Sequence, residues 1–248
     1  MKKRIQLTIT LLASLFSNLI YSKESPKVLI VVTSHTKLGN TNQSTGFWLP
    51  ELTHPYYALV REGIDVDVAS PKGGMAPIDN KSFEEEDVYN NSFLKDPILM
   101  RKVIQSTPLN KVDSKDYSAI IFAGGSGAMW DFPNNRDINR LAREVYERNG
   151  LVSSICHGAA ALVGITLSNG KKLVKEKKVA AFTKEEEIMI NQIDIIPFLL
   201  EDKLEESGAT HISGKAWQEN VIVDGKLITG QNPASALKVA KEVIKLLK

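Results

Sequence analysis

The only cysteine of the sequence, Cys156, is followed directly by a histidine. The pair lies in the run Ser154-Ile155-Cys156-His157-Gly158, at the end of an apolar stretch that begins at Leu151. A residue between a buried strand and a helix sits on a tight turn that lifts its side chain out of the sheet. The free N–H groups and the dipole at the helix start favour a thiolate over a thiol. The pattern therefore predicts a nucleophilic Cys156 with a lowered pKa, and a buried, inert cysteine is the alternative.

His157 has two interpretations, a general base for the cysteine or a first-turn helix residue. Side chains that are adjacent in sequence do not automatically face each other. A base also needs a third group that orients its other ring nitrogen. The residues alone leave this choice open.

A glycine-rich run follows a second apolar stretch. Ser118 to Phe122 predicts a buried strand, and Gly124-Gly125-Ser126-Gly127 comes just after it. In open parallel sheets ligands bind beyond the carboxyl ends of the strands. We therefore expect the glycine pair and Cys156 to share one site.

Strands and helices alternate along the chain. Apolar, β-branched runs predict strands at 27–33, 64–69, 118–122, 151–155 and 179–182. Helical spacing predicts helices at 50–61, 94–106, 137–147, 157–167, 195–206 and 233–247, and Asp224-Gly225 predicts a hairpin over 221–229. This alternation predicts an α/β fold with a mostly parallel sheet covered by helices on both faces.

The first 22 residues differ from the rest. Lys2-Lys3-Arg4 precedes an uncharged stretch, Ile5 to Ile20, and a small residue, Ser22, stands at the expected cleavage point. These features predict a secretory signal peptide. A membrane anchor is the alternative, but polar residues dilute the stretch and it is short for a spanning helix of ~20 residues. We expect a signal peptide over 1–22, one domain over 23–248, and an exported, periplasmic or secreted protein.

Composition limits the classes of partner. The chain is 43% hydrophobic and 24% charged, as soluble globular proteins are. Removal of residues 1–22 takes away three positive charges and changes the net charge from +2 to −1. The mature chain thus has no electrostatic basis for binding nucleic acid or anionic lipid, and we expect no stable membrane insertion. His54 and His211 lack tight ligand spacing with Glu51, so no metal is expected.

Three motifs occur in a fixed order: Gly124-Gly125-Ser126-Gly127-Ala128-Met129-Trp130-Asp131-Phe132-Pro133, then Cys156-His157-Gly158, then Thr229-Gly230-Gln231-Asn232-Pro233-Ala234-Ser235-Ala236. The chain resembles the ThiJ/PfpI superfamily over roughly residues 27–247, and within it the branch of glutathione-independent glyoxalases (glyoxalase III) and their stress-inducible chaperone relatives. The resemblance implies a flavodoxin-like three-layer sandwich, a Cys-His-Glu site without cofactor, and a homodimer.

The resemblance also assigns roles to residues. It implies that Cys156 is the nucleophile, that His157 is its base, and that Glu51 hydrogen-bonds the sulfur. Glu187 best matches the carboxylate that orients the histidine, although it is one of three consecutive glutamates at 185–187. Gly124, Gly125 and Ser126 are implied to hold the substrate oxygen, with a further N–H from His157.

Without the resemblance, these acidic residues have ordinary interpretations. Glu51 would be a helix-start residue stabilised by the dipole, and residues 185–187 the solvated start of a helix. The chain also departs from the family pattern at two positions. Ser126 stands where many relatives have a histidine, which puts the substrate preference in doubt. Ala159 stands where many have a proline, and alanine should leave the turn intact.

The reaction implied by the resemblance converts methylglyoxal, or a related 2-oxoaldehyde, to a 2-hydroxy acid such as D-lactate. A thiolate suits attack on an aldehyde, and the proton transfer needs a base close to its target. One rival is a cysteine peptidase or amidase of the PfpI type. A glutaminase is disfavoured because His211 is followed by Ile212-Ser213, where amidotransferases have a His-x-Glu motif. The second rival is a redox-sensing or holding chaperone without catalytic activity.

Overall fold

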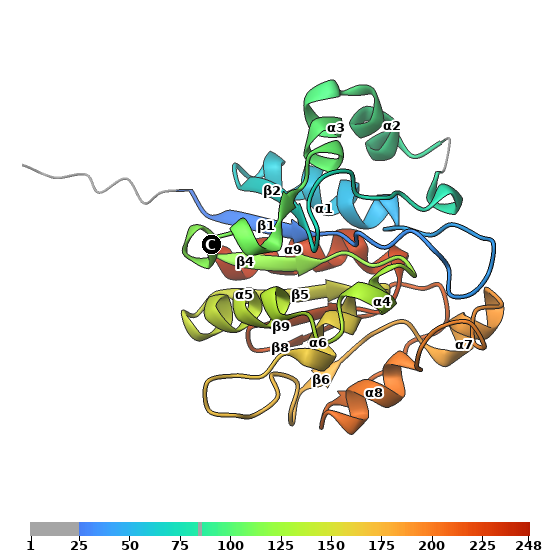
Figure 1. The fold of residues 1–248 in the computed structure, drawn as a ribbon. Coiled ribbons are helices and arrows are strands. Elements are labelled where there is room, and N and C mark those ends of the chain that lie inside the picture. The colour runs from blue at the N-terminus through green and yellow to red at the C-terminus, as the bar shows by residue number, and fades with distance from the viewer. Residues whose placement is uncertain (1–24, 84–85) are drawn as a thin grey trace, which may run out of the picture.

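A seven-stranded sheet forms the centre of the protein (Figure 1). The structure is a computed structural model, and it describes residues 25–83 and 86–248. The predicted signal peptide, 1–22, lies outside the described residues. The strands lie side by side in the order β3 (Thr107–Pro108), β2 (Asp65–Ser70), β1 (Lys27–Val31), β4 (Ala119–Phe122), β5 (Leu151–Ile155), β9 (Leu227–Gly230) and β8 (Val221–Asp224).

The sheet is parallel except at one edge. Every neighbouring pair runs parallel apart from β8 and β9. These two form the predicted hairpin, in which Asp224 pairs with Leu227 around Gly225, whose φ is +62°. Parallel strands covered on both faces are continuously apolar, which explains why β1, β4 and β5 stand out in the sequence.

Helices cover both faces of the sheet, so the predicted three-layer fold is confirmed (Figure 1). Val28 and Ile30 of β1 belong to the same hydrophobic cluster as the buried residues of α1 (Leu49–Arg61) and α9 (Ala236–Leu247). Leu29 and Val31 belong to the opposite cluster, with residues of α4 (Ala128–Asp131), α5 (Arg136–Glu147) and α6 (Ala160–Gly164). Successive strand residues point to opposite faces, and this alternation builds two cores.

Two predicted helices are shorter or divided. The helix expected over 94–106 is the end of α2 (Val88–Lys95) followed by α3 (Pro97–Ile104). Pro97 disfavours helical backbone at Asp96, whose side chain instead accepts hydrogen bonds from the N–H groups of Ile98 and Leu99 at the start of α3. The helix expected over 157–167 is a 3₁₀ turn, Cys156–Ala159, followed by the short α6.

The segment between β5 and β8 also differs from prediction. The strand expected over 179–182 is only β6 (Lys178–Val179), and it pairs with β7 (Thr210–His211) in a separate two-stranded sheet. The helix expected over 195–206 begins later, as α8 (Leu200–Glu206), after Pro197. An additional helix, α7 (Lys184–Met189), begins at Thr183 with a reciprocal Thr183–Glu186 capping box.

The order of the strands locates a crevice. The chain runs from β1 outward to β2 on one side and returns to β4 on the other side of β1. Such a reversal leaves a crevice beyond the carboxyl ends of the strands. The segments that follow β1, β4 and β5 meet there. No helix within residues 25–83 and 86–248 is both long and apolar enough to span a bilayer.

Candidate active site

Cys156 occupies a strained turn at the carboxyl end of β5. Its φ is +56°, a left-handed conformation that is uncommon for residues other than glycine. The turn packs against the neighbouring strand so closely that a Cβ on Gly158 would lie 2.1 Å from the carbonyl oxygen of Phe122. Strained backbone of this kind concentrates at functional sites. The structure thus keeps the predicted strand–turn placement of the cysteine.

The glycine pair after β4 lies directly against this turn. A Cβ on Gly124 would come within 2.7 Å of the carbonyl oxygen of Ile155. Gly125 has φ +97°, and a Cβ there would lie 2.4 Å from the carbonyl oxygen of Gly46. Only glycine therefore lets the end of β4 approach both β5 and the segment before α1. The expectation that the glycine pair and Cys156 lie together is met.

His157 lies between the cysteine and a buried carboxylate. Its Nδ1 is 3.4 Å from Cys156 Sγ, and its Nε2 is 2.7 Å from Glu187 Oε1. Of the three glutamates, Glu185 is exposed, Glu186 caps α7, and Glu187 contacts the histidine. The structure therefore gives His157 the third group that a base requires.

Glu51 is fully buried on the other side of the site, in the first turn of α1. Its Oε2 accepts a hydrogen bond of 2.7 Å from the N–H of Gly124. Burial raises the pKa of Glu51 to about 8, and the Gly124 N–H and the Cys156 thiol oppose that rise. Burial thus favours the protonated acid at Glu51, in contrast to the helix-start charge of the alternative interpretation.

The expected lowering of the Cys156 pKa is wrong for this structure. Burial is the largest influence and raises the pKa of the thiol well above its ordinary value. The charge of Glu51 would raise it further, but Glu51 carries that charge only above about pH 8. The N–H groups of His157 and Gly125 lower it and are outweighed. The helix dipole is small because the turn and α6 are short.

A cavity of about 80 Å³ opens onto the sulfur. Cys156, His157 and Gly125 line it, and Ser126 and Gln192 contribute polar groups. The rest of the wall is mostly apolar and is formed by Trp48, Phe182, Ile190, Trp217 and Pro233, with Asp79 and Lys81. Such a mixture of an apolar wall and a few convergent polar groups is typical of small-molecule sites.

Two of the predicted substrate-binding residues already have partners. The N–H of Gly124 donates to Glu51, so Gly124 holds that acid and does not offer this N–H to a substrate oxygen. Ser126 lines the cavity, and its hydroxyl donates to Gln192 Oε1 at 2.6 Å. Gly125 remains at the cavity surface. No group of three metal-ligating side chains comes together in the described part of the chain.

Comparison with known proteins now identifies the family. The model of the DJ-1/PfpI family matches residues 44–246. This chain belongs to the DJ-1/PfpI family. The Rapid Encystment Protein 24 kDa of Francisella tularensis has the same fold, with a TM-score of 0.88 and 46% identity over 90% of this chain and 99% of that one.

A sequence and a solved structure, both from Candida albicans, carry glyoxalase names. The chain is 28% identical to glyoxalase 3 of Candida albicans over 231 residues, which are 88% of this chain and 97% of the relative. It also matches the crystal structure of a Candida albicans glyoxalase III, with a TM-score of 0.83 and 27% identity over 90% of this chain and 98% of that one. This similarity extends over nearly the whole of both chains.

The roles of several residues at the site have no local sequence signal. Gln192 lies in a turn after α7 and reaches Ser126, 66 positions away in the chain. Trp217 has φ +60°, and no glycine or asparagine at that position marks the turn. Asn232 belongs to a family motif, but only the structure shows what its side chain binds.

Proposed function

We propose that this protein is a glutathione-independent glyoxalase, a lyase that converts methylglyoxal or a related 2-oxoaldehyde to a 2-hydroxy acid, D-lactate in the case of methylglyoxal. The proposal rests on one observation. Cys156 lines a small cavity and lies between a hydrogen-bonded His157–Glu187 pair and the buried Glu51, whose pKa is raised by burial. The glyoxalase names of the Candida albicans sequence and structure support the same reaction.

The first step is attack by the sulfur on the aldehyde carbon. Because burial raises the pKa of Cys156, the resting group is a thiol, and it must lose its proton as the bond forms. His157 is the base for that proton, and the contact with Glu187 stabilises the resulting imidazolium. The S–C bond forms, the carbonyl oxygen takes a proton, and the product is a hemithioacetal.

The second step moves hydrogen from C1 to C2 within the substrate. A base removes the C1 proton and the C2 oxygen is protonated, which gives an enediol. A proton then adds to C2 while the C1 hydroxyl loses its proton and becomes the carbonyl of a thioester on Cys156. Glu51 and His157 are the groups in place to exchange these protons. Water then hydrolyses the thioester, which releases the 2-hydroxy acid and restores the thiol. The overall change consumes one water and requires no redox partner.

The size of the cavity supports a small substrate over a peptide. Its volume of about 80 Å³ accommodates a few water-sized groups, since a single water needs roughly 10–15 Å³ by such a measure. A peptidase must also hold backbone on both sides of the scissile bond. The cavity therefore favours a small aldehyde over a peptide as the substrate.

A substrate panel tests the proposal. Mature protein, residues 23–248, should turn over methylglyoxal without glutathione and leave glutamine and peptides unchanged. Cys156→Ala should abolish this activity and retain the fold by circular dichroism. Glu51→Gln should lower kcat/KM by at least ~10²-fold, the usual size of a general acid–base effect. Peptide hydrolysis would favour the PfpI-type rival, and absence of turnover for every substrate would favour the redox-sensing or chaperone rival.

Two further parts of the proposal concern the protein in the cell. We propose export to the periplasm or the medium, on the strength of the basic and apolar segment at 1–22. We also propose a homodimer by similarity to the family, which light scattering on the mature chain would test.

A further inference from the structure

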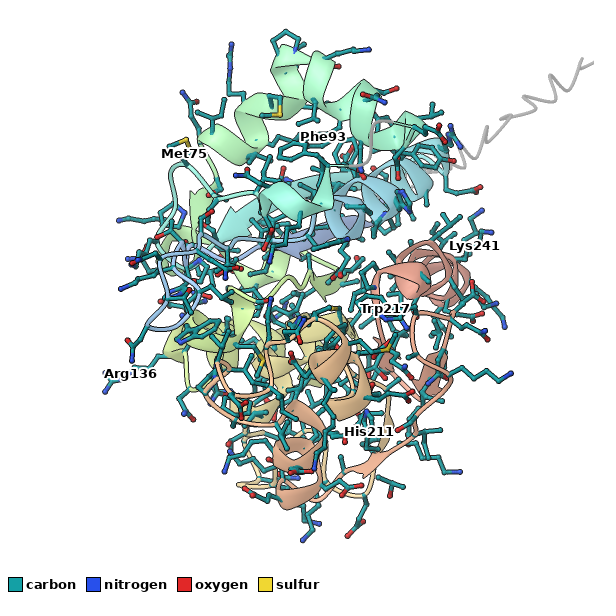
Figure 2. The ribbon with its side chains drawn as sticks, turned by 90° about the vertical axis from the view of Figure 1, so that its right-hand side faces the viewer. Met75, Phe93, Arg136, His211, Trp217 and Lys241 are labelled. Carbon is teal, nitrogen blue, oxygen red and sulfur yellow. The ribbon has the colours of Figure 1, made fainter. Side chains whose placement is uncertain are left out.

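The segment 212–220, here called the strap, contributes Trp217 to the wall of the cavity. Trp217 lies at its middle and lines the cavity, with 39% of its surface still exposed. Figure 2 shows Trp217 near the centre of the face turned toward the viewer, above His211. Its ring packs edge-on against Phe182, at 5.6 Å between centroids, and Phe182 in turn lies 4.2 Å from the ring of His157. A continuous aromatic contact thus joins the strap to the proposed base.

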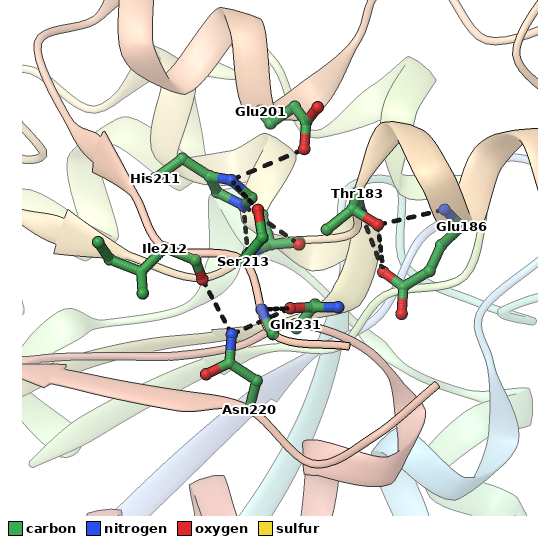
Figure 3. Close-up of polar contacts among 10 residues, drawn as sticks. Thr183, Glu186, Glu201, His211, Ile212, Ser213, Asn220 and Gln231 are labelled. Atoms are coloured by element: carbon green, nitrogen blue, oxygen red, sulfur yellow. Dashed lines mark hydrogen bonds and ion pairs between the residues drawn. The ribbon is translucent and has the colours of Figure 1, made fainter. Parts of the chain in front are cut away.

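Buried polar groups fix the two ends of the strap. The side-chain oxygen of Gln231 accepts hydrogen bonds from Gly214 N–H, at 2.7 Å, and from Asn220 Nδ2, at 2.9 Å. Asn220 Nδ2 also donates to the carbonyl oxygen of Ile212, which closes the strap into a loop. Figure 3 shows the Asn220 contacts to Gln231 and Ile212. Gln231 is fully buried, whereas Gly214 and Asn220 lie nearer the surface, so only the Gln231 side of its two bonds is shielded from water.

Glu186 and Asn232 hold the middle of the strap. Glu186 Oε1 accepts from Trp217 N–H, at 2.9 Å, and from Asn232 Nδ2, at 2.8 Å. Asn232 Nδ2 also donates to the carbonyl oxygen of Gln218. The other carboxylate oxygen of Glu186, Oε2, accepts hydrogen bonds from the N–H and the hydroxyl of Thr183 in the cap of α7, which Figure 3 also shows. Gln231 and Asn232, just after β9, and the middle glutamate of 185–187 therefore bind the strap.

This clamp holds Trp217 in a conformation that a bulky side chain rarely adopts. Its φ of +60° is strained for a residue other than glycine. Strain persists only where surrounding contacts over-determine the backbone, and the bond from Trp217 N–H to Glu186 is such a contact. Part of the free energy of these hydrogen bonds thus offsets the backbone strain that positions the Trp217 indole.

Trp217 separates two spaces. On one side is the cavity above Cys156, and on the other is an outer groove of about 300 Å³ lined by Pro50, His54 and Asp87. Trp48, Trp217 and Pro233 line both spaces and form the wall between them. Of these three residues, only Trp217 belongs to the strap.

We infer that Trp217 is the residue that sets substrate size, because it closes the Cys156 cavity off from the outer groove, and that Glu186 and Asn232 are its positioning residues. For a 2-oxoaldehyde, the methyl group of methylglyoxal fits on the near side of the indole, whereas an aryl group needs the space that the indole occupies. The identity of the substrate rests on the proposed function, but the size limit itself concerns any electrophile that approaches Cys156.

The first test compares two substrates with the same reacting carbons. The kcat/KM ratio of phenylglyoxal to methylglyoxal should rise roughly tenfold or more in Trp217→Ala, which is the scale on which an apolar pocket discriminates by size. Trp217→Phe should give an intermediate ratio. Ile104→Ala, which removes a side chain of similar exposure (48%) on α3, is the matched control and should leave the ratio unchanged.

The second test does not depend on the reaction. Cys156 is the only cysteine, so its alkylation can be followed alone, with iodoacetamide and with the larger 2-iodo-N-phenylacetamide, which share one reactive carbon. In Trp217→Ala the ratio of the alkylation rates, large reagent to small, should rise. The factor of this rise should be similar to the factor by which the kcat/KM ratio rises. Asn232→Ala should raise the kcat/KM ratio and the alkylation-rate ratio by a smaller factor than Trp217→Ala does. A merely structural loss would instead lower the alkylation rates of both reagents together.

The outcomes separate the two proposals. A raised alkylation ratio in a protein that turns over no 2-oxoaldehyde would sustain the size limit and refute the glyoxalase function. An unchanged alkylation ratio in folded Trp217→Ala would overturn the size limit whatever the protein catalyses. An unchanged substrate ratio in an active protein would overturn it as well, because the indole would then not act on the substrate.

Discussion

Around one sulfur atom, three ionisable side chains have different tasks because their surroundings differ. Glu51 is buried, with only one backbone N–H on its Oε2, and it retains its proton to about pH 8. Glu187 is also buried, but its Oε1 contacts the imidazole of His157, which can accept a proton and form an ion pair with the carboxylate. His157 lies between Glu187 and the thiol. Carboxyl groups in contrasting environments are a common way to divide acid and base roles.

The ionisation of Cys156 can be measured through its alkylation rate. We expect the rate with iodoacetamide to increase with pH without a plateau below about pH 8, because burial holds the thiol in its neutral form. Above about pH 8 the wild-type Glu51 becomes charged and raises the Cys156 pKa further. Glu51→Gln cannot acquire this charge, so it should react faster than wild type at pH 9. A plateau already present at pH 6 would show that the thiolate is the resting state.

The three glutamates at 185–187 provide a matched comparison. Glu187→Gln should lower kcat/KM by ~10²-fold or more, since the neutral amide cannot stabilise a charged His157. Glu185→Gln changes an exposed side chain of the same helix and should have no effect. Steady-state kinetics on methylglyoxal measure both. Equal losses in the two variants would mean that the His157–Glu187 contact has no catalytic role.

At the scale of elements, the site depends on how closely the ends of β4 and β5 approach each other. The contact is made by backbone, with glycines at 124 and 158 where any side chain would collide. Cys156, on the β5 side, absorbs the strain with a positive φ. The same approach places the Gly125 N–H beside the sulfur. Strand spacing, and not a flexible loop, therefore sets the geometry of the nucleophile.

Gly158→Ala tests this dependence. The new Cβ would meet the Phe122 carbonyl oxygen at 2.1 Å, so the turn must shift, and we expect a loss of activity together with a lower Tm. Gly63→Ala is the control, because its φ of +73° strains an alanine while no atom lies within 4 Å. That variant should lose only ~1 kcal/mol of stability and keep its activity. Full activity in folded Gly158→Ala would show that the strand contact is dispensable.

At the scale of the whole molecule, the active site is assembled from three parts of the chain. The sheet provides Cys156 and the glycines, α1 provides Glu51, and the segment between β5 and β8 provides Glu187 and the strap. The motif after β9 binds this last segment to the sheet through Gln231 and Asn232. Hence the site is complete only when the whole described domain has folded.

Export is a prediction for the full chain. The basic start and apolar stretch at 1–22 should direct secretion, with cleavage near Ser22 and a mature chain of net charge −1. N-terminal sequencing of periplasmic or secreted material measures the cleavage site. Intact Met1 in the membrane fraction would instead support the anchor.

Local sequence patterns were sufficient for much of the framework. The apolar runs at β1, β4 and β5 predicted buried parallel strands, because such strands need apolar side chains on both faces. The position of Cys156 between a strand and a helical turn followed from the same periodicity. Family motifs added Glu51 and Glu187, which local reasoning would have treated as helix-start charges.

The pKa values of Glu51 and Cys156, and the residues that form the cavity wall, were decided only by the tertiary structure. The pKa of a buried group depends on desolvation by elements distant in sequence, and Glu51 meets Gly124 across 73 positions. For this reason the predicted low pKa of Cys156 was wrong, although the residue itself was correctly chosen. Gln192 and Trp217 were missed because a side chain acquires such a role only when the chain brings it to the cavity, and no periodicity records that contact.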